Sequence, residues 1–577
     1  MCGLLLALAI VADVPSENVV VERELTAGRP LVLRLKQHDI AARWTALGNP
    51  ALPWTEGQGA FTARPDANPP ILAFVSAADL NRITVAADDL AHPLKVNGYL
   101  KYESGAEIEI SVAYPPGVSN RTSRVRIDTR AVPYWQSVRE AAAWMMRANP
   151  LEPSPEAAFD PLWNSWYAYR TGITADVMER EGKAAADLGL KNVIYDMGWD
   201  REGDVHSISF RPCGDWLPSE RNFPDIRSHF ARMHALGLKA LVWFGYPLVG
   251  TESKIYDRAK AWCLNQTPDR RGTLTLDPRR EEALEHVRTR MEALAELGAD
   301  GYKVDFIQTF GAYGAPDAAV MDFQRRLKAS LDQKFTALGK APPLIEYMNI
   351  YGGPGNLAFA TQVRASDCPG DAAENRMRTA RLRLLSGPKA VHCDMVTWDD
   401  AETPGRAAVQ LISVLHSVIQ VGRSVATLPA DHRRMLTNWL GFASAHRDTL
   451  LKGEFRPHGV VSGIVRTEME SAVERIVAVH APETVVPVTV DKTVCLLNGS
   501  PADAVVVELN APVEAELVNV FGETVGHRHL PKGLVRIDGL LTGSRAVLNG
   551  VELKEPFVRH ADIVKGGVLL FEMKTGN

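Results

Sequence analysis

The stretch DGYKVDF, residues 300–306, has the pattern of a short strand that leads into a functional site. Residues two apart on a strand point to the same side, so Lys303 and Asp305 face one way while Val304 and Phe306 face the other. Burying an ammonium and a carboxylate is costly unless the charges pair or take part in chemistry. The stretch therefore predicts either a buried structural ion pair or the floor of an active site.

Eight apolar strand patterns, of which this stretch is the fourth, alternate with helical patterns. In chain order they are LWNSWY, NVIYDM, ALVWF, YKVDF, LIEYM, TQVR, AVHCD and SVIQV. One helix is expected at about residues 174–188, with Thr174 as its cap and Gly189 at its end, and others at residues 225–237 and 281–298. The alternation predicts an α/β fold, a (β/α)8 TIM barrel. An open doubly wound sheet also fits, but less well, because no glycine-rich phosphate loop follows any of the strands.

Short β-branched runs flank the barrel on both sides. Before it, NVVVEREL, RITVAADD, EIEISVAYPP and SRVRIDT predict an N-terminal β-sandwich over residues 1–150, ending in the helix PYWQSVREAAAWMMRAN. After it, GVVSGIVRT, RIVAVHA, AVVVELN, AELVNVFG and GVLLFEMK predict a smaller antiparallel β domain over residues 451–577. The barrel is then expected to occupy residues 151–450.

Composition narrows the classes of partner. The chain has 577 residues, of which 46% are apolar and 23% charged, and a formal net charge of -5, as in ordinary soluble multidomain proteins. We expect neither a nucleic-acid nor a membrane partner, because the chain has no basic block and no apolar run of transmembrane length. Six scattered cysteines suit a reducing compartment and argue against a disulfide scaffold.

The sequence leaves open the nature of the apolar N-terminal segment and the oligomeric state. MCGLLLALAIVA, residues 1–12, has the length of a signal peptide but no positively charged start. We therefore expect a first strand or a truncated start, and a cytoplasmic protein, with secretion left open. A homo-oligomer is compatible with the sequence.

Polar and aromatic side chains gather at the carboxyl ends of the expected strands, where barrel enzymes carry their chemistry. They are Trp163, Asn164, Trp166, Asp196, Trp199, Trp243, Lys303, Asp305, Glu346, Arg364, Asp367 and Asp394. Carboxylates accept hydrogen bonds from sugar hydroxyls, lysine donates them, and indoles stack on a pyranose ring. The set predicts a carbohydrate substrate. Without HExxH or GxSxG, we expect neither a metal or other cofactor nor a serine nucleophile.

Two carboxylates in a tryptophan-rich pocket indicate glycoside hydrolysis, with one as nucleophile and the other as acid/base. Asp305 is the better nucleophile, because Lys303 would favour its ionised form. Asp367, in a loop after a strand, is the candidate acid/base. Asp371 competes for that role, although it is better placed to cap the helix that follows it.

Structural interpretations compete for several of the other residues. Glu346 fits a buried carboxylate bonded to a backbone amide, Asp394 a strand-end cap, and Cys368 an inert buried thiol. Trp163, Trp199, Trp216 and Trp262 fit the core or the rim.

Three longer blocks resemble the α-galactosidases of glycoside hydrolase family 36, in clan D. They are LWNSWYAYRTGITADVMEREGKAAADLGLKNVIYDMGWD, GDWLPSERNFPDIRSHFARMHALGLKALVWF and LGADGYKVDF. RASDCPGD also resembles the RxSDD segment of the plant alkaline α-galactosidase and raffinose synthase branch. The resemblance implies a barrel between two β domains, with Asp305 as nucleophile and Asp367 as acid/base. It assigns sugar contacts to Trp166, Asp196, Trp243, Lys303 and Arg364.

Two features depart from the family pattern, and one of them is at the acid/base segment, where the spacing and Cys368 are unusual. The family's paired aspartates, DDGW, are YDMGW here, so Met197 replaces a sugar-binding carboxylate with a thioether, which accepts hydrogen bonds poorly. We therefore expect either a sugar that differs from galactose at C4 or C6 or another α-glycoside altogether.

Three functions stay open at this point. The first is a retaining α-glycosidase, α-galactosidase-like or acting on a related sugar such as α-N-acetylgalactosamine. The second is a transglycosidase of the raffinose synthase type. The third is a non-catalytic sugar-binding barrel, which the presence of both aspartates disfavours.

Overall fold

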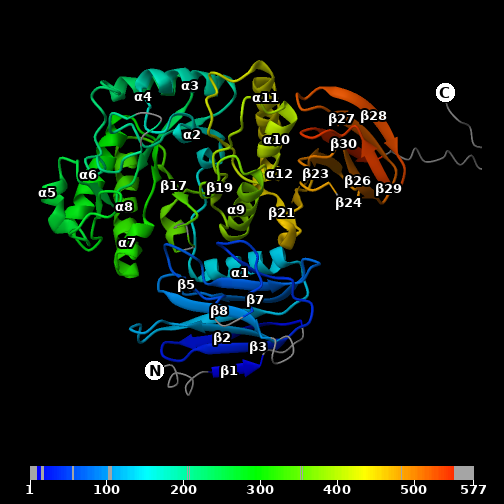
Figure 1. The fold of residues 1–577 in the computed structure, drawn as a ribbon, viewed down its shortest axis with the longest axis horizontal. Coiled ribbons are helices and arrows are strands. Elements are labelled where there is room, and N and C mark those ends of the chain that lie inside the picture. Colours follow the sequence, from blue (N-terminus) through cyan, green and yellow to red (C-terminus); the bar gives the residue numbers. More distant parts are fainter. Residues whose placement is uncertain are drawn as a thin grey trace, which may run out of the picture.

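The computed structural model describes residues 10–13, 18–54, 57–101, 107–203, 206, 208–350, 353, 355–482 and 484–550. Figure 1 shows three bodies: an N-terminal β-sandwich, a central barrel ringed by helices, and a C-terminal β domain beside the last barrel helices. This arrangement confirms the predicted fold class.

The N-terminal body consists of two five-stranded sheets that share a core of aliphatic side chains, among them Leu33, Ile110 and Ile127. One sheet has the order β1 (Ile10–Asp13), β3 (Leu31–Lys36), β9 (Glu107–Ala113), β8 (Leu94–Lys101) and β5 (Phe61–Ala63). The other has the order β2 (Val20–Thr26), β10 (Thr122–Asp128), β7 (Asn81–Ala87), β6 (Ile71–Val75) and β4 (Ala42–Thr45). Strand β1 covers the end of MCGLLLALAIVA, and residues 1–9 lie outside the described part.

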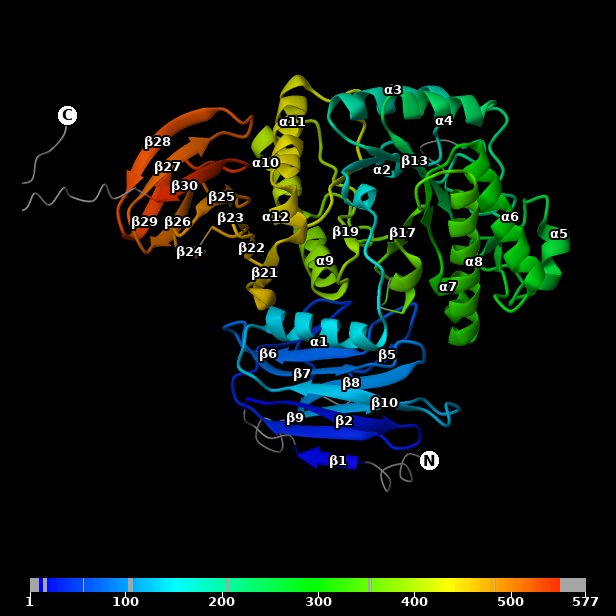
Figure 2. The same ribbon diagram turned by 180° about the vertical axis from the view of Figure 1, so that it is seen from behind.

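Helix α1 (Tyr134–Ala148) connects the sandwich to the barrel. Its buried face, which includes Val138, Ala141 and Met145, packs into the largest core cluster together with residues of β6. Figure 2 shows the helix lying between the sandwich and the barrel. The short helix η2 (Glu156–Phe159) then leads into the first barrel strand.

The barrel is built from eight parallel strands, and all eight predicted strands are present. They are β11 (Leu162–Asn164), β12 (Asn192–Tyr195), β13 (Lys239–Phe244), β16 (Gly301–Val304), β17 (Leu344–Met348), β18 (Gln362–Arg364), β19 (Ala390–His392) and β20 (Gln420–Val421). The sheet runs from β19 through β18, β17, β16, β13, β12 and β11 to β20. Isolated bridges, His392 with Val418 and Val396 with Val421, join β19 to β20 and close the ring. The carboxyl ends of all eight strands therefore meet at one end of the barrel.

Helices cover the outside of the barrel. The longer ones are α3 (Ala175–Asp187), α4 (Ile226–Ala235), α6 (Glu281–Leu297), α8 (Asp317–Ala337), α9 (Ala372–Leu385), α10 (Pro404–Ile412), α11 (Ala430–Ala445) and α12 (Arg447–Lys452). The shorter elements are α2 (Trp166–Tyr169), α5 (Tyr256–Ala259), α7 (Gln308–Ala312), η3 (Lys260–Trp262), η4 (Asn356–Phe359) and the strands β14 (Leu248–Gly250) and β15 (Thr273–Thr275). As predicted, Thr174 caps α3 by accepting from the N–H of Val177 at 3.3 Å, and Gly189 follows with a φ of 87°.

The C-terminal body contains a seven-stranded and a three-stranded sheet, whose strands pair antiparallel except β23 with β25 and β24 with β26. The larger has the order β21 (Glu454–His458), β22 (Arg466–Glu470), β23 (Glu474–Val479), β25 (Thr493–Asn498), β30 (Arg545–Gly550), β27 (Val513–Val518) and β28 (Thr524–Leu530). The smaller has the order β24 (Val485–Val488), β26 (Ala504–Leu509) and β29 (Gly533–Asp538).

One of the strand patterns expected in this body is only partly confirmed. GVVSGIVRT is mostly not a strand: the short helix η5 (Val460–Ser462) lies between Gly459 and Gly463, and β22 begins only at Arg466. GVLLFEMK lies outside the described residues.

Two further findings concern membrane-spanning helices and the state of the cysteines. Over the described ranges, no helix combines the length and the apolar character needed to cross a bilayer. The cysteines within those ranges, Cys213, Cys263, Cys368, Cys393 and Cys495, are all buried free thiols.

Candidate active site

Asp305 lies directly after β16, at the carboxyl end of the barrel. Its backbone N–H donates to the carbonyl of Phe244 at 3.1 Å, which extends the pairing of β16 with β13 by one residue. Trp243 Nε1 donates to Asp305 Oδ2 at 3.1 Å, and the N–H of Phe306 donates to Oδ1 at 2.8 Å. Both carboxylate oxygens are therefore held by neutral N–H donors, which fix the orientation of the group without supplying a full counter-charge.

Phe306 makes the second of these bonds from an uncommon backbone conformation. Its φ is 66°, in the left-handed region that residues with a Cβ rarely adopt. Its ring packs edge-on against Phe210, with centroids 5.2 Å apart, and against Trp243, and the Arg271 guanidinium lies 5.3 Å from the ring centroid. These contacts hold the strained residue, and with it the N–H, against Asp305.

Lys303 does not pair with Asp305, contrary to the structural ion pair considered from the sequence. Its Nζ donates to Asp196 Oδ2 at 2.5 Å, and the two residues are 4% and 3% exposed. Asp196 directly follows β12, and its Oδ1 accepts from the N–H of Met197 at 2.9 Å. The four-carbon lysine side chain thus reaches across β13, so the buried ion pair joins two strands that are not neighbours.

The pKa of Asp305 reflects these partners. Burial raises it above its usual range, and the negative charge of Asp367 adds to this effect. The charges of Lys303 and Arg364 and the bond from Trp243 act in the opposite direction without offsetting burial. The expectation that Lys303 favours the ionised carboxylate is correct in sign, but its effect is smaller than that of burial.

Arg364, the last residue of β18, organises the other side of the site. It is 1% exposed, and its NH1 donates to Asp394 Oδ1 at 2.6 Å and to Asp367 Oδ1 at 3.0 Å. Its Nε lies 3.6 Å from Glu346 Oε1. One guanidinium therefore contacts carboxylates from the middle of β17 and from the segments that follow β18 and β19.

Asp394 anchors the loop that carries Asp367. It is fully buried, and its Oδ2 accepts from the N–H of Cys368 at 2.6 Å and from the hydroxyl of Tyr167 at 2.9 Å. It is thus more than the strand-end cap expected from the sequence. Tyr167 was missed, although it follows Trp166 in the quoted stretch LWNSWY.

Asp367 is more exposed than Asp305, and unlike Asp305 it accepts a hydrogen bond from a charged side chain, that of Arg364. The side chain of Asp367 is 49% exposed. Partial desolvation raises the pKa of its carboxyl, but the charges of Arg364 and Lys303 outweigh this effect and hold the pKa below its usual range. Asp371 accepts from the N–H of Glu374 at 2.9 Å and caps α9, as predicted.

Glu346 lies in the barrel interior rather than at the mouth of the site. It is 1% exposed and accepts from the side-chain amides of Gln362 and Gln420, not from the backbone amide that was expected. His392 Nε2 donates to the carbonyl of Ala158 at 2.7 Å, and Nδ1 faces the Gln420 amide. These residues form a polar layer within the barrel.

The tryptophans divide into core and site residues. Trp163, Trp199 and Trp216 are at most 1% exposed and belong to the core, as expected, while Trp262 is half-buried. Trp166 is half-buried at the start of α2, with the Arg170 guanidinium 5.2 Å from its ring centroid.

Two sulfur-bearing side chains lie at the same end of the barrel. Cys368 is buried, which raises the pKa of its thiol and fits the inert role expected. Met197 is 2% exposed, as deeply buried as its neighbour Asp196.

Several known proteins resemble this chain in sequence over part of its length. A family model described as Melibiase matches residues 156–453. The chain is 25% identical over 248 residues to the α-galactosidase AgaA of Geobacillus stearothermophilus, covering 40% of this chain and 32% of that protein. It is 28% identical over 154 residues to the bifunctional α-galactosidase/sucrose kinase AgaSK of Mediterraneibacter gnavus, covering 26% and 16%. The matches thus span a third or less of these relatives.

Solved structures match over a larger part of the chain. The galactosidase domain of AgaSK superimposes with a TM-score of 0.62 at 15% identity, covering 92% of this chain and 78% of that one. The GH36 α-galactosidase AgaA from Geobacillus stearothermophilus gives a TM-score of 0.61 at 16% identity, covering 90% and 76%. At these identities the likeness establishes a shared fold.

Proposed function

Because the chain belongs to the Melibiase family, we propose that it is a retaining α-glycosidase that hydrolyses terminal α-galactosides or closely related α-glycosides. The family model and the curated α-galactosidases agree with the resemblance to glycoside hydrolase family 36 found in the sequence. The observation that carries the proposal is the pairing of Asp305 and Asp367. They directly follow or lie just after the parallel strands β16 and β18, at the same end of the barrel, and the charge of Asp367 contributes to the raised pKa of Asp305.

In the first step Asp305 acts as nucleophile. Its carboxylate attacks the anomeric carbon, the bond to the leaving oxygen breaks, and Asp367 donates its proton to that oxygen. In the second step Asp367 takes a proton from water, which attacks the anomeric carbon and releases Asp305. Two inversions give net retention. Trp243 and the Phe306 N–H keep the Asp305 carboxylate aimed in both steps.

The charges of the free site explain what substrate binding must accomplish. The raised pKa of Asp305 and the lowered pKa of Asp367 favour a proton on Asp305, whereas the reaction needs it on Asp367. A neutral sugar that covers the half-exposed Asp367 removes water from this carboxyl and raises its pKa. Arg364 still has Asp394 as a buried partner, so it can release Asp367 without losing its own counter-charge.

A second candidate differs in the sugar. Both oxygens of Asp196 already accept hydrogen bonds, from Lys303 and from the N–H of Met197. Met197 supplies no second carboxylate, so the site has less polar capacity than a DDGW pair would provide. This favours an α-glycoside that differs from a galactoside at C4 or C6, such as an α-glucoside, the C4 epimer; an α-N-acetylgalactosaminide, which differs at C2, is a further alternative.

A screen of nitrophenyl α- and β-glycosides, with the first-formed anomer followed by proton NMR, tests the proposal. We expect hydrolysis of α-glycosides with the α-anomer released first. A second sugar added as acceptor separates hydrolysis from transglycosylation, because transfer yields a new disaccharide. Release of the β-anomer first, or turnover of β-glycosides alone, would contradict the proposal.

A further inference from the structure

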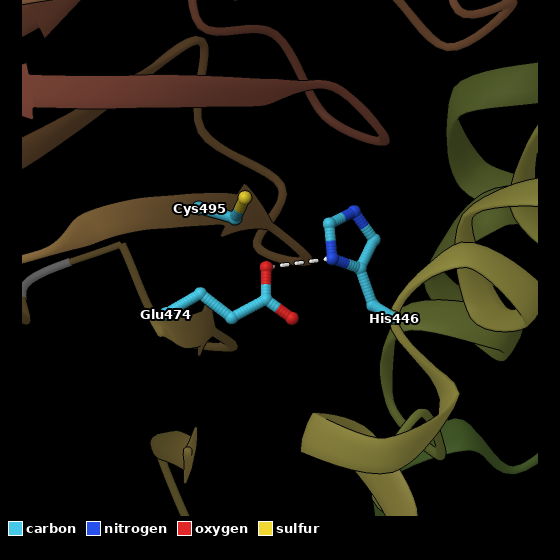
Figure 3. Close-up of side chains that lie close together, drawn as sticks. All are labelled: His446, Glu474 and Cys495. Carbon is cyan, nitrogen blue, oxygen red and sulfur yellow. Dashed lines mark hydrogen bonds and ion pairs between the residues drawn. The ribbon is translucent and has the colours of Figure 1, made fainter. Parts of the chain in front are cut away.

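Three side chains with metal-binding atoms converge away from the active site, where the last barrel helices meet the C-terminal β domain (Figure 3). His446 lies between α11 and α12, Glu474 begins β23, and Cys495 lies on the neighbouring strand β25. One ligand atom from each lies within 4.8 Å of the others. Among the described residues, no other group of three His, Cys, Asp or Glu side chains meets this criterion.

The donor set suits zinc better than the other common divalent ions. A thiolate, an imidazole and a carboxylate are all zinc ligands, while Ca²⁺ and Mg²⁺ prefer oxygen alone. Tetrahedral zinc keeps its ligand atoms about 3–4 Å apart, as its bond lengths require. His446 Nδ1 and Glu474 Oε2, now 2.8 Å apart, would have to separate slightly, and the sulfur would have to move inward. Shifts of this size lie within side-chain rotation.

The charges of the three ligands match those of a divalent ion. One carboxylate and one thiolate neutralise a divalent ion, and the imidazole binds in its neutral form. Burial, followed by the charge of Glu474, raises the pKa of the Cys495 thiol to about 11, while Arg545 opposes the rise. The thiol is therefore protonated in the free protein, and binding must release its proton.

Aromatic and charged side chains lie beside the cluster, and Cys495 itself is buried. The Arg545 guanidinium donates to Asn438 Oδ1 at 3.1 Å and lies 5.3 Å from the Phe442 ring centroid. The Phe442 ring also lies 4.3 Å from the imidazole of His446 and holds it in place. The side chains of His446 and Glu474 are 25% and 15% exposed, which leaves room for water as a fourth ligand.

We propose that His446, Glu474 and Cys495 bind one zinc-type divalent ion, which fastens the end of the barrel to the C-terminal β domain. The ion would join α11 and α12 to β23 and β25, and would strengthen a boundary that now has the His446–Glu474 contact. The site is independent of the glycosidase assignment.

Cobalt titration of the full-length, untagged, chelator-treated chain tests the site. We expect one equivalent of Co²⁺ to bind, with visible d–d bands and a near-ultraviolet thiolate-to-cobalt charge-transfer band that Zn²⁺ then removes. Zn²⁺ should also raise the melting temperature, because it binds only the folded chain. Absence of the charge-transfer band at one equivalent would overturn the proposal.

Variants assign the signal to these residues. Cys495→Ser should abolish the charge-transfer band and weaken binding at least about tenfold, and Glu474→Gln should weaken binding similarly while keeping the band. His458→Gln is the matched control, because His458 faces Glu468 at 3.3 Å in the same domain outside the cluster; it should bind as wild type does. A Cys495→Ser protein that keeps the band overturns the assignment. If the Cys495→Ser variant lacks a cooperative melting transition and so does not fold, the test is Glu474→Gln. Cobalt binding by Glu474→Gln that is as tight as in wild type would then overturn the assignment.

Discussion

The two sides of the candidate active site hold their carboxylates by different means. On the side of β12, β13 and β16, Asp305 accepts hydrogen bonds from two neutral N–H groups, and the nearest lysine is bonded to Asp196. On the side of β18 and β19, a guanidinium contacts Asp367 directly. Neutral donors fix geometry but only partly offset burial, whereas a guanidinium also stabilises the negative charge. The pKa of Asp305 is therefore raised and that of Asp367 lowered.

The largest effect should come from removing the carboxylate held by neutral donors. Asp305→Ala is expected to lower kcat by at least about 10³-fold with the fold intact, because a covalent nucleophile is lost. Azide should restore part of the activity with an activated aryl α-glycoside and yield a β-glycosyl azide. Circular dichroism and the melting temperature serve as the folding control. A variant within tenfold of wild type would show that Asp305 is not the nucleophile.

The next effect should depend on the leaving group. Asp367→Ala is expected to lower kcat/KM about 10²–10⁴-fold for α-glycosides of poor leaving groups and far less for activated aryl glycosides, since only the former need a proton. Asp371→Ala is the matched control: its carboxylate caps α9, so it should affect stability and treat both substrates alike. If Asp371→Ala showed the dependence on the leaving group and Asp367→Ala did not, Asp371 would be the acid/base and Asp367 would not.

A smaller effect should appear in the pH dependence. Lys303 lowers the pKa of both Asp305 and Asp367, because its positive charge stabilises their ionised forms. In Lys303→Met both pKa values rise, so both limbs of the kcat/KM profile should move to higher pH, by about one unit. The activity at the optimum should also fall, since Asp196 loses its buried partner. Limbs that stay in place or move to lower pH would show that Lys303 does not govern the pair.

The smallest effect should concern the choice of sugar. Met197→Asp restores the DDGW pattern and is expected to raise kcat/KM by about tenfold relative to the α-glucoside for nitrophenyl α-galactoside, and equally for the α-N-acetylgalactosaminide, which differs from it only at C2. The measurement compares all three substrates in wild type and variant. If wild type already prefers the galactoside widely and the variant loses activity, Met197 is a core residue and Asp196 alone contacts the sugar.

The barrel was predictable from the sequence because its strands are short apolar runs separated by helices, four of which begin at a capping side chain. The C-terminal domain was less so. GVVSGIVRT has a strand's composition, yet Gly459 and Gly463 adopt left-handed conformations and close a helical turn between them. The strand β21 (Glu454–His458) that precedes it was missed, and it contains Pro457, a residue usually confined to edge strands. Local composition alone does not decide between these outcomes.

The sequence was enough to predict which polar residues lie at the carboxyl end of the barrel, but not how they are hydrogen-bonded to one another. Strand spacing places Lys303 and Asp305 on one side, but the lysine bonds a carboxylate 107 residues away in the chain. A long side chain selects among several carboxylates at the barrel end, and only the folded arrangement shows which one it reaches. The backbone donors to Asp305 and Asp394, from Phe306 and Cys368, leave no trace in residue type.

At Phe306 the stability of the fold and the activity of the site favour different residues. A left-handed conformation costs a residue with a Cβ roughly 1–2 kcal/mol, a cost that glycine would avoid. Glycine would also lose the ring that packs against Phe210 and Trp243. Laboratory evolution for heat resistance alone should therefore tend to relax this position, whereas selection for turnover should preserve it.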